Sequence, residues 1–92
     1  DEDPFFALLA RGGARLMIKA ILPDVLPMPN HSRHPWAKWD AYVDSSNPDA
    51  LAAEFLGRGV IFRLPLGDTD DRLRGFEIQD PDGYVFFFGR PL

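Results

Sequence analysis

The start of the chain carries the pattern of a β-hairpin. Alternate positions between residues 15 and 21 are apolar, namely Leu16, Ile18 and Ala20, and this period of two is typical of a strand with one buried face. An apolar run over residues 4–10 precedes this segment, and Gly12 and Gly13 separate the two. Glycine readily adopts the positive φ angles that tight hairpin turns require. An antiparallel pair of strands is therefore predicted within residues 4–21.

Regular patterning stops between residues 22 and 38. Four prolines fall in this segment, and because proline fixes φ and has no amide hydrogen, a long irregular connection is predicted. The segment also holds both histidines of the chain, His31 and His34, together with Trp36. Connections of this length in compact domains are commonly functional lids or links between sub-modules.

Strand and helix signals alternate from residue 39 onward. A strand is predicted over residues 39–44, and alternation divides its side chains between two faces: Trp39, Ala41 and Val43 on one, and Asp40, Tyr42 and Asp44 on the other. A helix is predicted over residues 48–57, because a capping Ser or Asn precedes Pro48 at the first helical position. Its buried stripe is expected to consist of Leu51, Phe55 and Leu56.

Three further strands are predicted after the helix, over residues 60–64, 74–79 and 84–88. A polar loop through residues 67–71 separates the first two, and the acidic run at 68–71 is interpreted as solvated. An Asp-Pro-Asp-Gly turn at residues 80–83 separates the last two. In the last strand, Phe86 and Phe88 are expected to face the helix as core. The order of elements is ββ, a long loop, then βαβββ.

The second half of the chain resembles a known superfamily. Residues 47–55 read Asn-Pro-Asp-Ala-Leu-Ala-Ala-Glu-Phe, the helix closes at Gly-Arg-Gly-Val, and residues 74–84 read Arg-Gly-Phe-Glu-Ile-Gln-Asp-Pro-Asp-Gly-Tyr. This succession resembles the glyoxalase/bleomycin-resistance/dioxygenase superfamily, also called vicinal oxygen chelate proteins, and in particular its bleomycin-resistance members. In that family Asp-Pro-Asp-Gly forms the tight hairpin before the final strand.

The resemblance implies an α+β fold in which paired βαβββ modules form a cupped mixed sheet. Residues 1–92 then make one domain: strands of the first module (1–21), a connector (22–38) and a complete second module (39–92). The first strand, helix and second strand of the first module are expected to be absent, so that module is incomplete. Because an unpaired sheet edge would remain, a homodimer that covers it is expected.

Metal-dependent members of the superfamily carry ligands on facing strands of the cup. The resemblance places Asp40 where a His usually stands and Phe87 where a Glu usually stands, four residues after Gly83. Asp40 can bind a hard cation through oxygen, but Phe87 offers no lone pair. Catalytic zinc keeps three protein ligands, so neither a metal nor another cofactor is expected. A metal-ligating side chain in the absent N-terminal segment, or His31 and His34, would reverse the expectation that no metal is bound.

The cup face of the strands is the predicted place of function. By alternation, Phe87 shares that face with Asp40 and Tyr42, which predicts an aromatic pocket with an acidic rim, suited to a planar or cationic ligand. Glu77 is expected as a second acid on the neighbouring strand if its face is the cup, and paired carboxylates can do acid–base work. The predicted ligand-binding residues are Asp40, Tyr42, Glu77 and Phe87. The alternative is that Phe87 fills a closed barrel and the acids are solvated.

The composition of the chain argues against nucleic acid and membranes as binding partners. The net charge of the 92 residues is −4, and no run of Lys or Arg is present to displace the counterions of nucleic acid. No stretch approaches the roughly 20 apolar residues of a membrane span. With no cysteine, a disulfide framework and thiolate chemistry are excluded. A cytoplasmic protein that binds neither nucleic acid nor membrane is expected.

The leading hypothesis for function is a metal-free small-molecule-binding protein that sequesters an aromatic or cationic ligand in the cup or in a dimer groove. The alternative is a metal-dependent enzyme of the same superfamily, a glyoxalase-type lyase or an extradiol-type dioxygenase, with a ligand from the missing N-terminal segment. A third hypothesis is that the chain is a subunit of a larger assembly, with a sheet edge that only contacts other subunits and binds no small molecule. The sequence does not decide whether the protein is an enzyme, and it favours a binding protein without catalytic activity.

Overall fold

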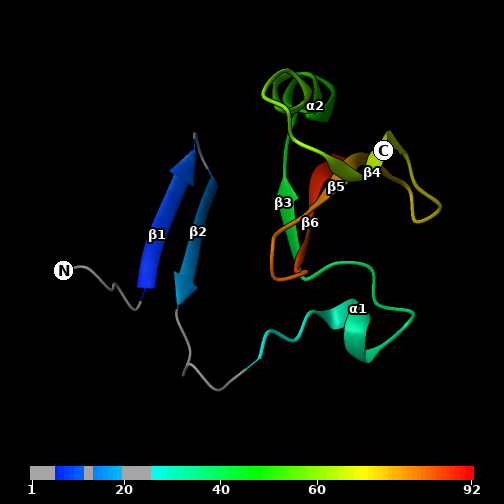
Figure 1. The fold of residues 1–92 in the computed structure, drawn as a ribbon. Coiled ribbons are helices and arrows are strands. Elements are labelled where there is room, and N and C mark those ends of the chain that lie inside the picture. Colours follow the sequence, from blue (N-terminus) through cyan, green and yellow to red (C-terminus); the bar gives the residue numbers. More distant parts are fainter. Residues whose placement is uncertain (1–5, 12–13, 20–25) are drawn as a thin grey trace.

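The computed structural model describes residues 6–11, 14–19 and 26–92, the first two ranges by their backbone. Two helices and six strands follow one another along this part of the chain (Figure 1): β1 (Phe6–Arg11), β2 (Ala14–Lys19), α1 (Asn30–Arg33), β3 (Ala41–Asp44), α2 (Pro48–Gly57), β4 (Phe62–Asp68), β5 (Leu73–Gln79) and β6 (Val85–Pro91). Among these residues no helix combines the length and apolar character needed to cross a membrane.

Strands β1 and β2 form the predicted hairpin. They pair antiparallel in a sheet of their own, with Arg11 opposite Ala14. Two residues therefore connect the strands, as the glycine pair predicted. Gly12, Gly13 and Ala20 themselves lie outside the described residues.

The other four strands form a mixed sheet in the order β3-β6-β5-β4. Strand β3 runs parallel to β6, whereas β6–β5 and β5–β4 are antiparallel. Helix α2 makes the crossover between β3 and β4 and contacts β4, β5 and β6. It begins as predicted, because Asn47 Oδ1 accepts a hydrogen bond from Ala50 N (3.2 Å) and Pro48 stands in the first turn. The predicted βαβββ order is confirmed.

Aromatic side chains fill the space between α2 and the sheet. The Phe55 ring meets Phe76 and Phe88 edge-on, with ring centroids 5.6 and 5.5 Å apart. Phe62 stacks on Phe76 at 4.6 Å. The prediction that Leu56 is buried is wrong, since its side chain is 61 % exposed. The inward stripe runs through Pro48 and Ala52, which are buried, and Leu56 lies on the flank of that stripe.

The opposite face of the sheet is built around Phe87, which is 1 % exposed. Gly75 and Gly89 lie directly opposite each other on β5 and β6. A Cβ atom on Gly75 would stand 2.7 Å from Phe87 Cζ, and one on Gly89 would stand 2.6 Å from Phe87 Cε2. The Phe87 ring therefore lies flat over two positions that tolerate no side chain.

The Asp40 carboxylate fastens the connector to the sheet. Its Oδ1 accepts a hydrogen bond from Asn30 N (2.7 Å) and its Oδ2 accepts one from Val85 N (2.8 Å). Nearby, His31 Nε2 donates to Gly83 O at 2.8 Å. These contacts hold the short helix α1, which the sequence did not predict, against the β5–β6 turn.

Several strand boundaries also differ from the predictions, and β6 extends to Pro91. Strand β4 covers residues 62–68 rather than 60–64, because Gly67 and Asp68 of the predicted polar loop pair with Gly75 and Arg74. Regular strand structure in β3 begins at Ala41, after Trp39. Trp39 therefore escapes the alternation of the strand and lies on the side of Tyr42 (centroids 5.5 Å apart) instead of the opposite one.

Gly75→Ala and Gly89→Ala are expected to lower the free energy of unfolding by about 1–3 kcal/mol each, because a Cβ there collides with the Phe87 ring and with backbone atoms. Gly67→Ala on β4 is the matched control, since nothing lies within 4 Å of its added Cβ. Urea unfolding measures all three. Equal stability of the Gly89 and Gly67 variants would contradict the close packing described.

Asp40→Ala is expected to destabilise the fold by about 1–3 kcal/mol, because two backbone amides lose their acceptor. Amide hydrogen exchange at Asn30 and Val85 should accelerate together. Asp44→Asn, an exposed change on the same strand, should leave both exchange rates unchanged. Unaltered exchange in the Asp40 variant would show that the clamp is unimportant.

Candidate functional site

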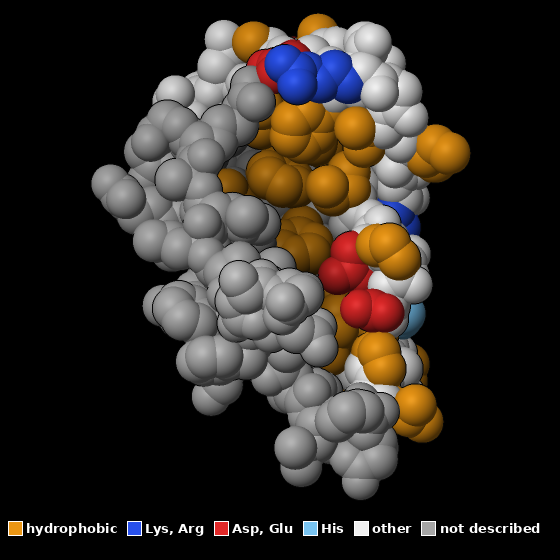
Figure 2. Space-filling model, turned by 60° about the vertical axis from the view of Figure 1, so that its left-hand side comes forward, with side chains coloured by type: hydrophobic (Ala, Val, Ile, Leu, Met, Phe, Trp, Pro, Cys, Tyr) orange, Lys and Arg blue, Asp and Glu red, His pale blue; other side chains and the backbone are white. Residues whose placement is uncertain are grey.

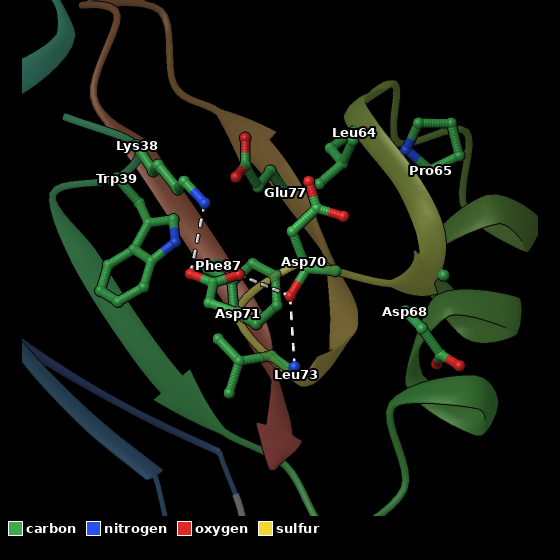
Figure 3. A pocket seen from close by; sticks show the side chains of 12 residues that line it. Lys38, Trp39, Leu64, Pro65, Asp68, Asp70, Asp71, Leu73, Glu77 and Phe87 are labelled. Carbon is green, nitrogen blue, oxygen red and sulfur yellow. Dashed lines mark hydrogen bonds and ion pairs between the residues drawn. The ribbon is translucent and has the colours of Figure 1, made fainter. Parts of the chain in front are cut away.

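A hollow of about 330 Å³ opens on the face of the sheet that carries Phe87 (Figure 3). Three parts of the chain surround it: the end of the connector, strand β4 with the β4–β5 loop, and the middle of β5 and β6. Its lining consists of Lys38, Trp39, Leu64, Pro65, Gly67, Asp68, Thr69, Asp70, Asp71, Leu73, Glu77 and Phe87. The bends that place β4 around the hollow come from register shifts on either side of Leu64, and Pro65 fits there because β4 is an edge strand.

The floor of the hollow is aromatic. Trp39 stacks on Phe87 with centroids 5.9 Å apart, and Tyr42 stacks on Phe87 at 5.5 Å. Tyr42 lies beside the lining and not in it. Burial, and secondly the negative charge of Asp44, raise the pKa of the Tyr42 phenol above its usual value. Its hydroxyl is therefore neutral at physiological pH, and Tyr42 contributes to the site by stacking its ring on Phe87.

The rim is acidic. Four carboxylates line the hollow together with one cation, Lys38. Glu77 is bound by Arg63 at 2.7 Å, and Asp68 by Arg74 at 2.9 Å. Asp70 is exposed, and none of the ion pairs found among the described residues includes it. The balance of charge around the hollow is therefore negative.

The β4–β5 loop is ordered by its own side chains. Thr69 Oγ1 donates to Asp71 Oδ1 at 2.7 Å and accepts from Leu73 N at 3.2 Å. The hydrogen bond from Thr69 lowers the pKa of Asp71, and Lys38 Nζ, 3.3 Å away, lowers it further. Asp71 thus stays ionised down to an acidic pH, and the contact between the connector and this loop is lost only as the pH falls through that lowered pKa.

Arg72 completes this loop in an unusual conformation. Its φ of +66° lies in the left-handed region, which residues other than glycine rarely adopt. Its amide donates to Thr69 O at 3.1 Å, and its carbonyl accepts from Leu92 N at 2.9 Å. Such backbone strain is commonly found beside functional sites, and here it closes the turn that carries Asp70 and Asp71.

The structure brings together only part of the residue set predicted from the sequence. Glu77 and Phe87 both line the hollow, on facing positions of β5 and β6, and Tyr42 stacks beneath. Asp40 lies outside the lining, and both of its carboxylate oxygens already accept backbone hydrogen bonds.

Lys38, Trp39 and the acidic loop were not predicted as parts of the site. The acidic run at 68–71 was the available signal, since it joins the two strands that flank the cup. The prediction for Trp39 was wrong because alternation holds only within a strand, and Trp39 precedes the first residue of β3.

The donors present do not fit a transition metal. Within the described residues, no group of three or more His, Cys, Asp and Glu side chains is placed to hold a metal ion. Phe87, on the face that lines the hollow, has no atom able to bind a metal. His31 is hydrogen-bonded to Gly83 O, and His34 stacks on Trp36 with centroids 4.9 Å apart.

Comparison with known proteins addresses the fold. No protein-family model matches the chain, and no curated protein matches its sequence. Among solved structures, the chain is similar to the crystal structure of TioX from Micromonospora sp. ML1, with a TM-score of 0.62 and 23 % sequence identity. The similarity covers 96 % of this chain and 69 % of TioX. At this identity the likeness establishes the fold alone: the chain has the α+β architecture of TioX, built here on a βαβββ module, as the resemblance to vicinal oxygen chelate proteins implied.

Proposed function

We propose that this chain belongs to the glyoxalase/bleomycin-resistance/dioxygenase superfamily and binds a small aromatic or cationic molecule without a metal. The observation that carries the proposal is the hollow itself, in which an aromatic floor meets an acidic rim. Ligand sites of proteins are typically concave and mostly apolar, with a few polar groups that fix orientation.

The floor supports an aromatic ligand. Phe87 is buried, because its ring lies over two glycine positions and under the rings of Trp39 and Tyr42. Trp39 is half-buried and lines the hollow with its indole. A flat ring that enters the hollow can stack on this indole, and indole is also the best aromatic partner for a cation.

The rim supports a positive charge on that ligand. Most carboxylates of the lining already have a basic partner, but Asp70 adds an exposed charge that no ion pair within the described residues neutralises. A cleft with one sign of charge raises the local concentration of oppositely charged ligands. An anionic ligand would meet repulsion from Asp70, whose charge no basic side chain of the described residues offsets.

The size of the hollow limits the ligand. Its volume of about 330 Å³ lies near the lower end of the range of roughly 300–1,000 Å³ found for small-molecule sites. We therefore propose a ligand of one or two fused rings for this hollow. A larger ligand would need the groove that a second copy of the chain would add.

Trp39→Ala is expected to weaken the binding of 1-naphthylmethylammonium by about tenfold, because stacking and cation–π contact with indole are lost. Calorimetric titration measures the dissociation constant, with 2-naphthoate as the anionic comparison. Trp36→Ala is the matched control, since Trp36 is 76 % exposed and stacks on His34 outside the lining.

Two results would contradict this function. One is equal binding of 2-naphthoate and the naphthylmethyl cation, and the other is an equal loss of affinity in the Trp36 and Trp39 variants. A stoichiometric transition metal in the purified protein, found by elemental analysis, would favour the alternative of a metal-dependent lyase or dioxygenase instead.

We also propose that a second copy of the chain covers part of this surface. Large apolar side chains are exposed among the described residues: Leu26, Met28, Trp36, Leu56, Ile61, Leu64 and Leu92. Figure 2 shows hydrophobic side chains gathered in a band on one face, bordered by charged side chains. Exposed apolar surface of this kind commonly marks an interface.

A homodimer is expected in sedimentation velocity at micromolar concentration. Ile61→Lys, directly before β4, is a suitable variant because this side chain is 87 % exposed, and the added charge is expected to weaken the dimer without entering the core. A monomer across the micromolar range in the unaltered protein would count against the proposal.

A further inference from the structure

Glu77 is a buried carboxylate that faces the hollow. It is 6 % exposed, lines the hollow, and lies opposite Phe87 in the register of β5 and β6. Removing a carboxylate from water is costly unless it is paired and hydrogen-bonded. A glutamate at this position therefore needs a partner, and the partner comes from the edge of the sheet.

Arg63 is that partner, and a bulge in β4 aims it. Phe62 stands opposite Ile78 while Leu64 stands opposite Glu77, so Arg63 is an additional residue in the ladder between β4 and β5. Bulges re-aim side chains and are frequent near binding sites. Arg63 Nη1 reaches Glu77 Oε1 at 2.7 Å, and the Arg63 side chain keeps 36 % of its surface exposed. The pair joins a solvated guanidinium to a buried carboxylate.

The second oxygen of Glu77 is available for a ligand. Arg63 donates to Oε1, and no other donor among the described residues reaches this carboxylate. Every fully enclosed side-chain nitrogen or oxygen in the described part has a hydrogen-bond partner, so Oε2 must retain access to open space. Glu77 is one of the residues that line the hollow, and in the view of Figure 3 its side chain lies between the labelled Trp39 and Leu64.

We infer that Glu77 is the specificity-determining residue of the hollow and that Arg63 is a positioning residue, which holds the Glu77 carboxylate in a fixed orientation. This inference rests on the proposed function. The ligand class that follows is a planar aromatic base with N–H donors in the ring plane, such as an amidine or a 2-amino-azaheterocycle. Its ring stacks on Trp39, and its in-plane N–H group donates to Glu77 Oε2.

An in-plane donor is favoured over a simple ammonium group for a geometric reason. Arg63 already offsets the charge of Glu77, so what Oε2 offers is a directional acceptor more than an unpaired charge. The stacked ring lies along the floor made by Trp39 and Phe87, and donors in the ring plane point toward the wall that carries Glu77. An ammonium on a flexible arm gains little from a fixed acceptor because the arm must be immobilised.

The test compares two probes of similar size at a pH where the second is neutral. 2-Aminobenzimidazole carries in-plane N–H donors, and neutral 1,2-dimethylbenzimidazole lacks them. Calorimetric titration gives the ratio of their dissociation constants, and the unaltered protein is expected to prefer the donor-bearing probe by about 10- to 100-fold. Glu77→Gln is expected to reduce this preference about tenfold or more, whereas Asp82→Asn, which removes an exposed charge in the β5–β6 turn, should not.

The role of Arg63 is tested by the same ratio of the two affinities. Arg63→Gln is expected to lower the preference for the donor-bearing probe, and Arg63→Lys to restore part of it. Arg58→Gln at the end of α2, with a side chain 69 % exposed, is the matched control. Should Arg63→Gln fail to fold, the double variant Arg63→Leu, Glu77→Leu removes both charges, which commonly leaves stability unchanged or higher. The double variant is expected to bind both probes equally.

The outcomes separate this inference from the proposed function. If Trp39→Ala abolishes binding of both probes while Glu77→Gln leaves their ratio unchanged, the hollow binds aromatics but Glu77 does not select among them, and the inference is wrong. If neither probe binds and no aromatic cation binds, the proposed function fails first. If the double variant keeps the full preference, the donor contact lies elsewhere.

Discussion

The contact between Phe87 and the Gly75–Gly89 pair is the constraint on which the described module depends. The ring can lie flat only because two facing positions of β5 and β6 have no Cβ. Once it lies flat, it fills the concave face of the sheet and gives Trp39 and Tyr42 a surface on which to stack. The opposite face of the same two strands presents Phe76 and Phe88 to α2. One pair of strands thereby organises both aromatic clusters.

The chain that leads into this module is fastened by hydrogen bonds more than by apolar contact. Asp40 bridges the amides of Asn30 and Val85, and His31 reaches the carbonyl of Gly83. These bonds hold the end of the connector beside the first residues of β6. As a consequence, Lys38 and Trp39 stand at the edge of the hollow, where Lys38 meets Asp71 of the β4–β5 loop.

The ion pairs of the module divide into two kinds. Arg74 binds Asp49 of α2 and Asp68 of β4 at 2.8 and 2.9 Å, and these partners are largely solvated. Pairs of this kind contribute little to stability, although this one lowers the pKa of Asp49. The Arg63–Glu77 pair differs because its carboxylate is buried and belongs to a residue that lines the hollow. A buried ion pair is weak evidence for a role in stability, and its position favours a role in recognition.

The sequence by itself determined the order of the strands and the place of α2 among them, but it did not predict α1. The period of two, the proline at the start of α2 and the Asp-Pro-Asp-Gly turn are local signals, and each led to an element that the structure contains. Alternation also separated Glu77 from its neighbours Phe76 and Ile78, and Phe87 from Phe86 and Phe88, because a regular strand keeps a period of two. It left open whether the face of Glu77 is that of Phe87. Where regularity fails, the local signal fails with it: Trp39 lies before the strand begins, and Arg63 occupies a bulge.

Only the tertiary structure decided which of the predicted residues share a site. Asp40 carries the same chemistry as the acids of the rim, but two amides distant in sequence occupy its oxygens. The run at 68–71 is indistinguishable in sequence from a solvated loop, and it becomes a rim because β4 bends over the sheet. Periodicity reports on residues that are neighbours in sequence, whereas this site is made by contacts between residues that are far apart in sequence.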